Sequence, residues 1–186
     1  YSEAEKHYNR GIEILKTHFD ESTPIYSITL GNLAGVYKEV GAYQKSEKLY
    51  RDALRIKKAI FGSNHPSVAN TSNNLALLYQ ILGQYSEAEK LFQDACVIAK
   101  NQGEEGKTNY ATFLNTWATL YLTMGKYSEA EPLYMESKKL RKEEFGEMHI
   151  NYGYSLSGLG LLYRKMGRFE EAEVLFVEAK KIFKNT

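Results

Sequence analysis

The feature that most constrains the fold of this sequence is a pattern that returns every 42 residues. Glycine recurs at this spacing, and two positions after each of these glycines the chain carries a tyrosine or a phenylalanine. The glycines are Gly41, Gly83, Gly125 and Gly167, and the aromatic residues are Tyr43, Tyr85, Tyr127 and Phe169. A fixed period of roughly 20 to 50 residues indicates stacked structural repeats. We therefore expect one supersecondary unit that is repeated along the chain.

Each repeat reads as two helices joined by a tight turn at the glycine. In residues 73–92, for example, one helix ends before Gly83 and a second begins after it. Small and large residues occupy alternating positions in successive repeats, which is how facing helices interdigitate to the density of a protein core. The small positions include Ala34, Ala76, Ala118 and Gly160, and the large ones include Tyr37, Tyr79, Tyr121 and Tyr163.

The period divides the chain into one incomplete and four further repeats of a single solenoid. We expect the second helix of a truncated repeat in residues 1–23 and repeats at 24–65, 66–107, 108–149 and 150–186, which makes nine helices. Pro24 and Pro66 fall at helix starts, where proline is tolerated because the first N–H has no partner within the helix. Because the chain opens on Tyr1 in the middle of a repeat, we expect it to be part of a longer protein.

The composition argues against several classes of protein. The 24 Lys and Arg residues are balanced by 23 Asp and Glu residues, whereas binding to nucleic acid needs an excess of positive charge. No apolar run approaches the roughly 18 residues of a membrane span. We therefore expect neither a nucleic-acid nor a membrane partner. Cys96 is the only cysteine, which excludes an internal disulfide and favours a reducing, cytoplasmic location.

The turn sequence Gly-x-[Tyr/Phe]-x-x-[Ala/Ser]-Glu, together with the order of small and large residues, resembles the tetratricopeptide repeat. The 42-residue period is similar to that of the longer repeats of kinesin light chains and nephrocystin, and residues 62–69 and 73–79 carry the closest match. The resemblance covers essentially the whole chain. It implies an all-α, right-handed superhelical solenoid of antiparallel helix pairs. It also implies that the first helix of each pair lines a concave groove that binds an extended peptide or a partner helix.

The resemblance, carried over position by position, implies the residues of this groove. They are Asn70, Asn73, Leu77, Gln80 and Ile81 in the second repeat, Thr112, Asn115, Thr119 and Leu122 in the third, and Tyr154, Ser157, Leu161, Arg164 and Lys165 in the fourth. Asn73 and Asn115 are the first candidates for partner contacts, because an amide both donates and accepts hydrogen bonds. Alternatively, these asparagines are solvated or tie neighbouring helices together. Arg164 and Lys165 favour an acidic partner, or are simply solvated.

We expect no catalytic, metal or cofactor site. One glutamate recurs in each repeat, in the first turns of the second helices, where the helix dipole favours negative charge. These residues are Glu5, Glu47, Glu89, Glu131 and Glu173. Cys96 is expected to be an inert buried thiol.

Gly153, Gly158 and Gly160 lie within one predicted helix, where each glycine lowers the stability of the helix by about 0.5–1 kcal/mol. We therefore expect a neighbouring helix or a ligand to approach closely there.

Two functions remain open on the sequence alone. The first is a non-catalytic scaffold or sensor that holds a segment of a partner protein in its groove. The alternative is a spacer or self-association module attached to an effector or enzymatic domain outside this sequence. End-to-end self-association is a further possibility, because terminal repeats normally need a polar outer face and the last helix carries Phe176, Ile182 and Phe183.

Overall fold

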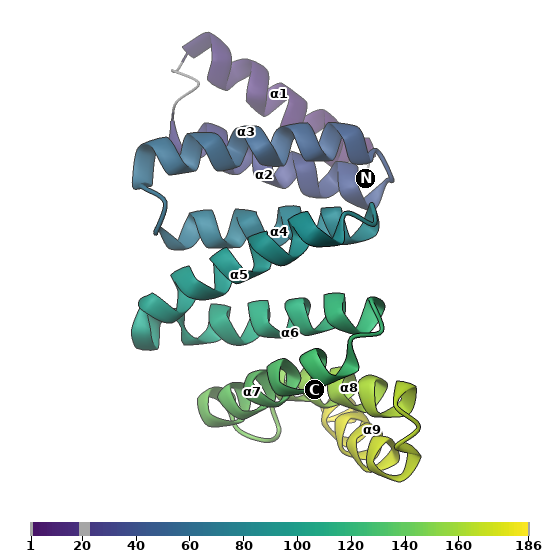
Figure 1. Cartoon of the computed structure of the whole chain (residues 1–186). Helices are drawn as coiled ribbons and strands as arrows, with labels where there is room; N and C mark the ends of the chain where they lie inside the picture. The colour runs from purple at the N-terminus through teal and green to yellow at the C-terminus, as the bar shows by residue number, and fades with distance from the viewer. Residues whose placement is uncertain (1, 19–22, 186) are drawn as a thin grey trace. The chain divides into compact units, whose positions relative to one another are not determined.

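The computed structural model describes residues 2–18 and 23–185, and this part of the chain contains nine α-helices and one short 3-10 helix (Figure 1). The prediction of nine helices is thus confirmed. Tyr1 and residues 19–22, which belong to the expected truncated repeat, lie outside the described residues. The helices are α1 (Ser2–His18), α2 (Pro24–Glu39), α3 (Tyr43–Phe61), α4 (Pro66–Ile81), α5 (Tyr85–Asn101), the 3-10 helix η1 (Gly103–Gly106), α6 (Lys107–Thr123), α7 (Tyr127–Phe145), α8 (Ile150–Lys165) and α9 (Phe169–Lys184).

The recurring glycines end the first helix of each pair. Gly83 has a φ of 73°, a left-handed conformation that glycine adopts without steric cost. The amide of the following residue, Gln84, donates a hydrogen bond of 2.9 Å to the carbonyl of Tyr79 and so satisfies one of the last carbonyls of α4. The same bond recurs in the other three turns, from Ala42 to Tyr37, Lys126 to Tyr121 and Arg168 to Tyr163.

Side-chain caps fix where three of the first helices begin. The Thr23 hydroxyl accepts a hydrogen bond from the amide of Tyr26, at 3.3 Å, at the start of α2. His65 and His149 occupy equivalent positions before α4 and α8, and the Nδ1 atom of each accepts a hydrogen bond from a helix amide, at 3.2 and 3.1 Å. An N-cap acceptor of this kind satisfies one of the amides that have no partner within the helix.

The chain packs as two compact units, Tyr1–Ile98 (the N-terminal unit) and Ala99–Thr186 (the C-terminal unit). In the N-terminal unit, α2 packs against α1 and α3, and α3 packs against α4. One of its core clusters is formed by Tyr26, Leu30, Ala53 and Ile56. In the C-terminal unit, α7 packs against α6 and α8, α9 packs against α8, and α6 also contacts α8.

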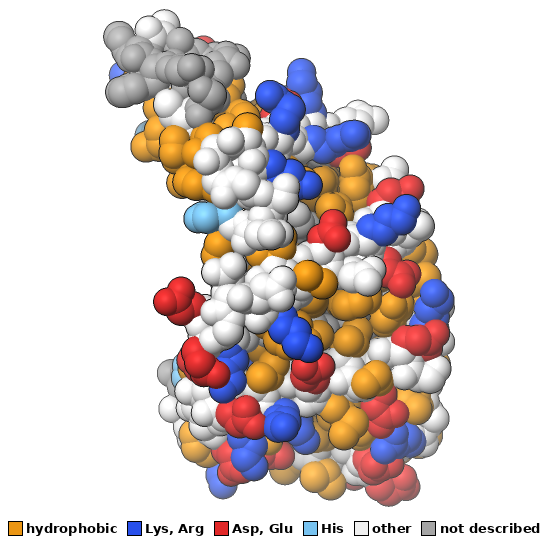
Figure 2. Space-filling view, turned by 60° about the vertical axis from the view of Figure 1, so that its left-hand side comes forward, with side chains coloured by type: hydrophobic (Ala, Val, Ile, Leu, Met, Phe, Trp, Pro, Cys, Tyr) orange, Lys and Arg blue, Asp and Glu red, His pale blue; other side chains and the backbone are white. Residues whose placement is uncertain are grey.

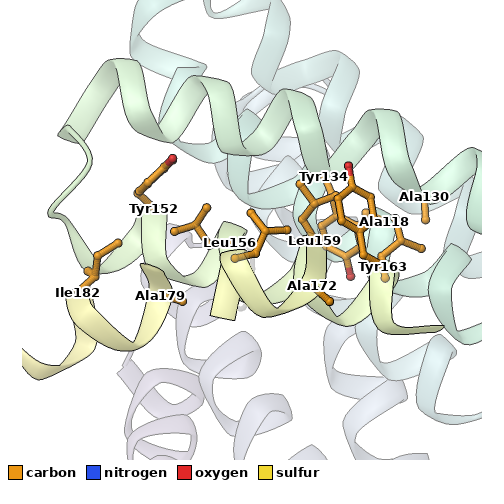
Figure 3. Packing of buried hydrophobic residues seen from close by; sticks show 12 residues of the cluster. Ala118, Ala130, Tyr134, Tyr152, Leu156, Leu159, Tyr163, Ala172, Ala179 and Ile182 are labelled. Atoms are coloured by element: carbon orange, nitrogen blue, oxygen red, sulfur yellow. The ribbon is translucent and has the colours of Figure 1, made fainter. Parts of the chain in front are cut away.

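The core of the C-terminal unit follows the predicted alternation of small and large residues (Figure 3). Ala118, Ala130 and Ala172 are at most 3% exposed, and they belong to the same buried cluster as Tyr134, which is 1% exposed. Serine can replace alanine at such positions because its hydroxyl bonds to the facing helix. Ser137 Oγ, for instance, donates a hydrogen bond of 2.7 Å to the carbonyl of Ala111.

Candidate partner-binding faces

The C-terminal unit presents one row of accessible residues on each of its two first helices. We define the α6–α8 face as Thr112, Asn115, Thr119 and Leu122 of α6 with Tyr154, Ser157, Leu161, Arg164 and Lys165 of α8. Tyr154, Arg164 and Lys165 are exposed and the other six are half-buried. By contrast, Leu156 and Leu159 of α8 point into the core and are at most 2% exposed. All nine residues predicted in these repeats are therefore at least partly accessible.

Tyr134 of α7 reaches beneath the α6–α8 face from the core. Its hydroxyl lies 2.9 Å from Thr119 Oγ1, so the two groups share a hydrogen bond. Burial raises the pKa of the Tyr134 phenol, so the hydroxyl stays protonated. A Cβ atom on Gly158 would lie 2.7 Å from Cε1 of this ring, which explains the glycine. The expectation that a neighbouring helix approaches closely at Gly158 is thus confirmed.

Asn115 places an unused hydrogen-bond acceptor at this face. Its Oδ1 atom is buried, and no group among the described residues donates a hydrogen bond to it. A Cβ on Gly158 would lie 3.4 Å from this oxygen, so the amide sits beside α8 at this glycine. A buried acceptor without a donor typically costs about 1–3 kcal/mol. The residue as a whole is half-buried.

Arg141 of α7 adds a buried positive charge beneath the same face. It is 7% exposed. Its Nη1 atom donates to the Asn151 carbonyl and to Ser155 Oγ, both at 3.1 Å. Its Nη2 atom donates to Thr112 Oγ1 at 3.4 Å. These partners are all neutral, and burial lowers the pKa of the guanidinium, so the charge is only partly compensated.

The N-terminal unit differs from expectation at one of the two leading candidates. Asn70 and Ile81 of α4 are exposed, and Leu77 and Gln80 are half-buried, as partner contacts require. Asn73, however, is only 6% exposed and has an interaction partner within the chain. It lies in a buried polar run with Thr71 and Ser72. This environment favours the alternative in which Asn73 ties helices together.

Lys57 of α3 is a buried cation that was not predicted from the sequence. It is 8% exposed, and its Nζ atom donates a hydrogen bond of 2.8 Å to Thr71 Oγ1 of α4. Burial lowers the pKa of its ammonium group. Lys57 and Arg141 lie two repeat lengths apart, and so do their partners Thr71 and Ser155. An alignment of the repeats places five residues in one column and would have revealed two cations at an otherwise apolar position. The residues of this column are Leu15, Lys57, Ala99, Arg141 and Phe183.

Two of the recurring glutamates connect packed elements. Glu47 of α3 accepts a hydrogen bond of 3.1 Å from the Tyr79 hydroxyl of α4. Burial, together with this carboxylate, raises the pKa of Tyr79. Glu131 of α7 accepts a hydrogen bond of 2.8 Å from Arg168 in the turn after α8. The side chain of Glu5 lies outside the described residues. Within the described ranges, no three His, Cys, Asp or Glu side chains gather as metal ligands would.

A second accessible feature of the N-terminal unit is a cleft of about 520 Å³ beside α3. It is lined by three leucines, Tyr79, four cations and Glu87. The leucines are Leu54, Leu75 and Leu91, and the cations are Arg51, Arg55, Lys58 and Lys90. On the face shown in Figure 2, acidic and basic side chains are interspersed over much of the surface. No helix in the described part of the chain is long and apolar enough to cross a membrane.

The helix pairs are antiparallel, recur every 42 residues and carry accessible rows of residues on their first helices. These features define a helical-repeat protein. Residues 25–101 and 109–185 match the model of the Tetratricopeptide repeat family, and the chain therefore belongs to that family. The resemblance inferred from the turn sequence and the column order is thus confirmed.

Solved structures of similar fold include kinesin light chain-like proteins. BtubC (BKLC) from P. vanneervenii superposes with a TM-score of 0.82 at 22% identity, over 99% of this chain and 73% of that one. A kinesin light chain-type protein of Podosopora anserina with nearly identical TPR-like repeats gives 0.79 at 22%, over 99% and 87%. MamA gives 0.63 at 18%, over 97% and 87%. These likenesses establish the fold. No curated protein matches this chain in sequence.

Proposed function

We propose that the chain is a non-catalytic protein-binding module that holds an extended segment of a partner protein along the accessible faces of its first helices. Tetratricopeptide repeats generally act as scaffolds for protein–protein interaction. The observation that carries the proposal is the α6–α8 face, where apolar and hydrogen-bonding side chains remain accessible on two helices that touch each other.

The chemistry of the α6–α8 face suits a peptide. Tyr154 is 54% exposed, and Leu161 and Leu122 are half-buried, so apolar side chains of a partner would find contact area. Once its amide turned outward, Asn115 would accept a hydrogen bond from a backbone N–H of the partner, which would satisfy the oxygen that is now buried without a donor. Main-chain recognition of this kind tolerates many partner sequences.

The charges near this face favour a partner that carries carboxylates. Arg164 and Lys165 are exposed at the end of α8, and Arg141 is buried beneath Thr112 with neutral partners only. Arg141 contacts the first turns of α8, whereas Arg164 and Lys165 end this helix, so the two charged regions lie at opposite ends of α8. A partner carboxylate near either region would be stabilised by the positive charge there. We therefore expect acidic residues in the bound segment.

A peptide selection tests the proposal. Binders would be selected from a random peptide library on the 186-residue chain, and their affinities would be measured by fluorescence anisotropy. Tyr154→Ser and Asn115→Ala are each expected to weaken binding about tenfold, as the loss of a well-placed contact does. Lys139→Ala, at an exposed position of α7, is the matched control and should change nothing. Unchanged affinity in both groove variants would show that the peptides bind elsewhere.

A further inference from the structure

The cleft beside α3 lies between three helices of the N-terminal unit, and we call it the α3–α5 cleft. Each helix contributes one leucine to it, namely Leu54 from α3, Leu75 from α4 and Leu91 from α5. Its volume of about 520 Å³ is within the range of binding sites. Other helices precede and follow these three along the chain, so the cleft does not arise at either end of the sequence.

The cleft lies on the side of α4 that is opposite to the predicted groove row. Leu75 and Tyr79 line the cleft. Leu77 and Ile81 of the groove row follow them by two positions each, which is about 200° around a helix. A ligand in the α3–α5 cleft would therefore not occupy the predicted groove.

A second hollow adjoins the cleft and makes the surface elongated. This hollow of about 390 Å³ is lined by Val68 and Ser72, and Lys58 borders both it and the cleft. Val68, Ser72, Leu75 and Tyr79 recur at intervals of three or four positions, so they share one side of α4. They cover about 16 Å of helix. A surface of this length suits a polypeptide segment better than a compact small molecule.

The cleft carries positive charge that the chain compensates only in part. Four cations line it, but Glu87 is the one acidic residue among the lining side chains. Arg51 and Arg55 each have an acidic neighbour on α3, at 3.3 and 3.9 Å. Lys58 and Lys90 lie on opposite walls, and neither forms an ion pair with another described residue. A carboxylate bound between the walls would supply the missing opposite charge.

The repeat framework does not require this combination of leucines and unpaired cations. Two repeats later, the positions of Leu54 and Lys90 are occupied by Lys138 and Val174. The helices there pack in the same pairs, so neither the leucine nor the lysine is needed for that packing. The combination is therefore a property of this cleft.

We propose that the α3–α5 cleft binds an acidic amphipathic helix of a partner protein. Apolar side chains of this helix contact the three leucines, and its carboxylates pair with Lys58 and Lys90. Burial of the apolar side chains drives the association, and the opposite charges select the partner. This site is separate from the α6–α8 face and does not rest on peptide binding there.

The spacing of the cations on α3 favours a helix over an extended segment. Arg51, Arg55 and Lys58 lie about 6 and 4.5 Å apart along the helix axis. Carboxylates three or four residues apart on a partner helix have the same spacing. Side chains on one side of an extended segment are instead about 6.6 Å apart.

Isothermal titration calorimetry with a designed peptide tests this inference. The probe is a capped helical peptide of about 14 residues, roughly four turns, with leucines on one face and glutamates beside them. The 186-residue chain is expected to bind it with a dissociation constant on the order of 10–100 μM. The same peptide with lysines for glutamates should not bind detectably, and serines for leucines should weaken binding at least tenfold.

Charge reversals in the chain locate the site. Lys58→Glu and Lys90→Glu should each weaken binding of the acidic peptide about tenfold. Both lysines are exposed, so the variants should keep the wild-type circular dichroism spectrum. Lys139→Glu is the matched control, because Lys139 occupies the Arg55 position two repeats later, on α7. It should leave the affinity unchanged, and so should Tyr154→Ser.

Four results would overturn the inference. The first is no binding of the acidic peptide at millimolar concentration. The second is equal affinity for the acidic and the lysine peptide. The third is binding that resists both charge reversals but is lost in Tyr154→Ser, which would place the peptide at the α6–α8 face. The fourth is a dimer of the chain, seen by ultracentrifugation, that Lys90→Glu abolishes, which would place a second copy in the cleft.

Discussion

At the scale of single residues, Lys57 and Arg141 depart most from an apolar repeat core. Both are less than 9% exposed, and both donate to hydroxyl groups of the next first helix. A buried charge with neutral partners is costly, because desolvation is not offset by an opposite charge. The two residues therefore stabilise the repeat less than an apolar residue of similar length would.

Lys57→Met should consequently stabilise the N-terminal unit. Thr71 keeps its own hydrogen bond to the Ser67 carbonyl, at 2.9 Å, so its hydroxyl is not left without a partner. We expect the free energy of unfolding in urea to rise by about 1 kcal/mol at neutral pH. Lys48→Met, at an exposed position of the same helix, is the control and should change it by less than about 0.5 kcal/mol. A loss of stability in Lys57→Met would show that the buried charge is not a net cost.

The pH dependence gives a second readout of the same substitution. The pKa of Lys57 is lowered in the folded state from its ordinary value of 10.5. The unfolded chain therefore holds this proton more tightly. The free-energy cost of burying the charged ammonium group is fully present when the pH is below the folded pKa. As pH rises through the folded pKa toward 10.5, the wild type recovers stability. The advantage of Lys57→Met should accordingly shrink with rising pH.

The candidate site was only partly predictable residue by residue. The repeat register located Asn115 and Tyr154 on an accessible face, because first-helix positions recur in every repeat. The same register misplaced Asn73, which is 6% exposed. Burial of a small polar residue depends on hydrogen-bond partners from other helices, such as the run from Thr71 to Asn73. A single sequence does not reveal those partners, and the buried cations were missed for the same reason.

At the scale of helices, the sequence predicted where the helices begin and end. Glycines at φ above 70° end the first helices, prolines begin two of them, and the helix bounds follow these markers. Pro132 lies in the second turn of α7, and the helix continues through it. What the pattern could not provide was the detail of how α8 packs over α6 and α7, because that depends on Tyr134 and Gly158 together.

Gly158→Ala tests this packing. The added Cβ would lie 2.7 Å from the Tyr134 ring, which is 1% exposed and has no room to move. We expect a loss of about 1–3 kcal/mol in the free energy of unfolding, as overpacking in a core produces. Gly31→Ala is the matched control, since no atom lies within 4 Å of its added Cβ. This control should be neutral or stabilising by up to about 1 kcal/mol. Equal effects of the two substitutions would refute the packing explanation.

At the scale of the whole molecule, the period of 42 residues predicted stacked repeats. The turn sequence and the order of small and large residues predicted the family, and the family model confirms it. Because 24 basic residues nearly balance 23 acidic residues, the total charge does not indicate what kind of partner the chain binds. The proposed information about partners lies instead in local features such as the α6–α8 face. This face arises from contacts between helices, so the sequence pattern indicated its position but not the buried groups beneath it.

The central claim is that the accessible faces of the first helices bind a protein segment, and side-chain footprinting tests it most directly. Hydroxyl radicals would be used to label the chain with and without a saturating library-selected peptide. We predict that Tyr154 and Leu161 of α8 become protected, while Met135 of α7 and Val174 of α9, both exposed, are labelled as before. Protection of Met135 or Val174 without protection of Tyr154 would contradict the assignment of the binding face.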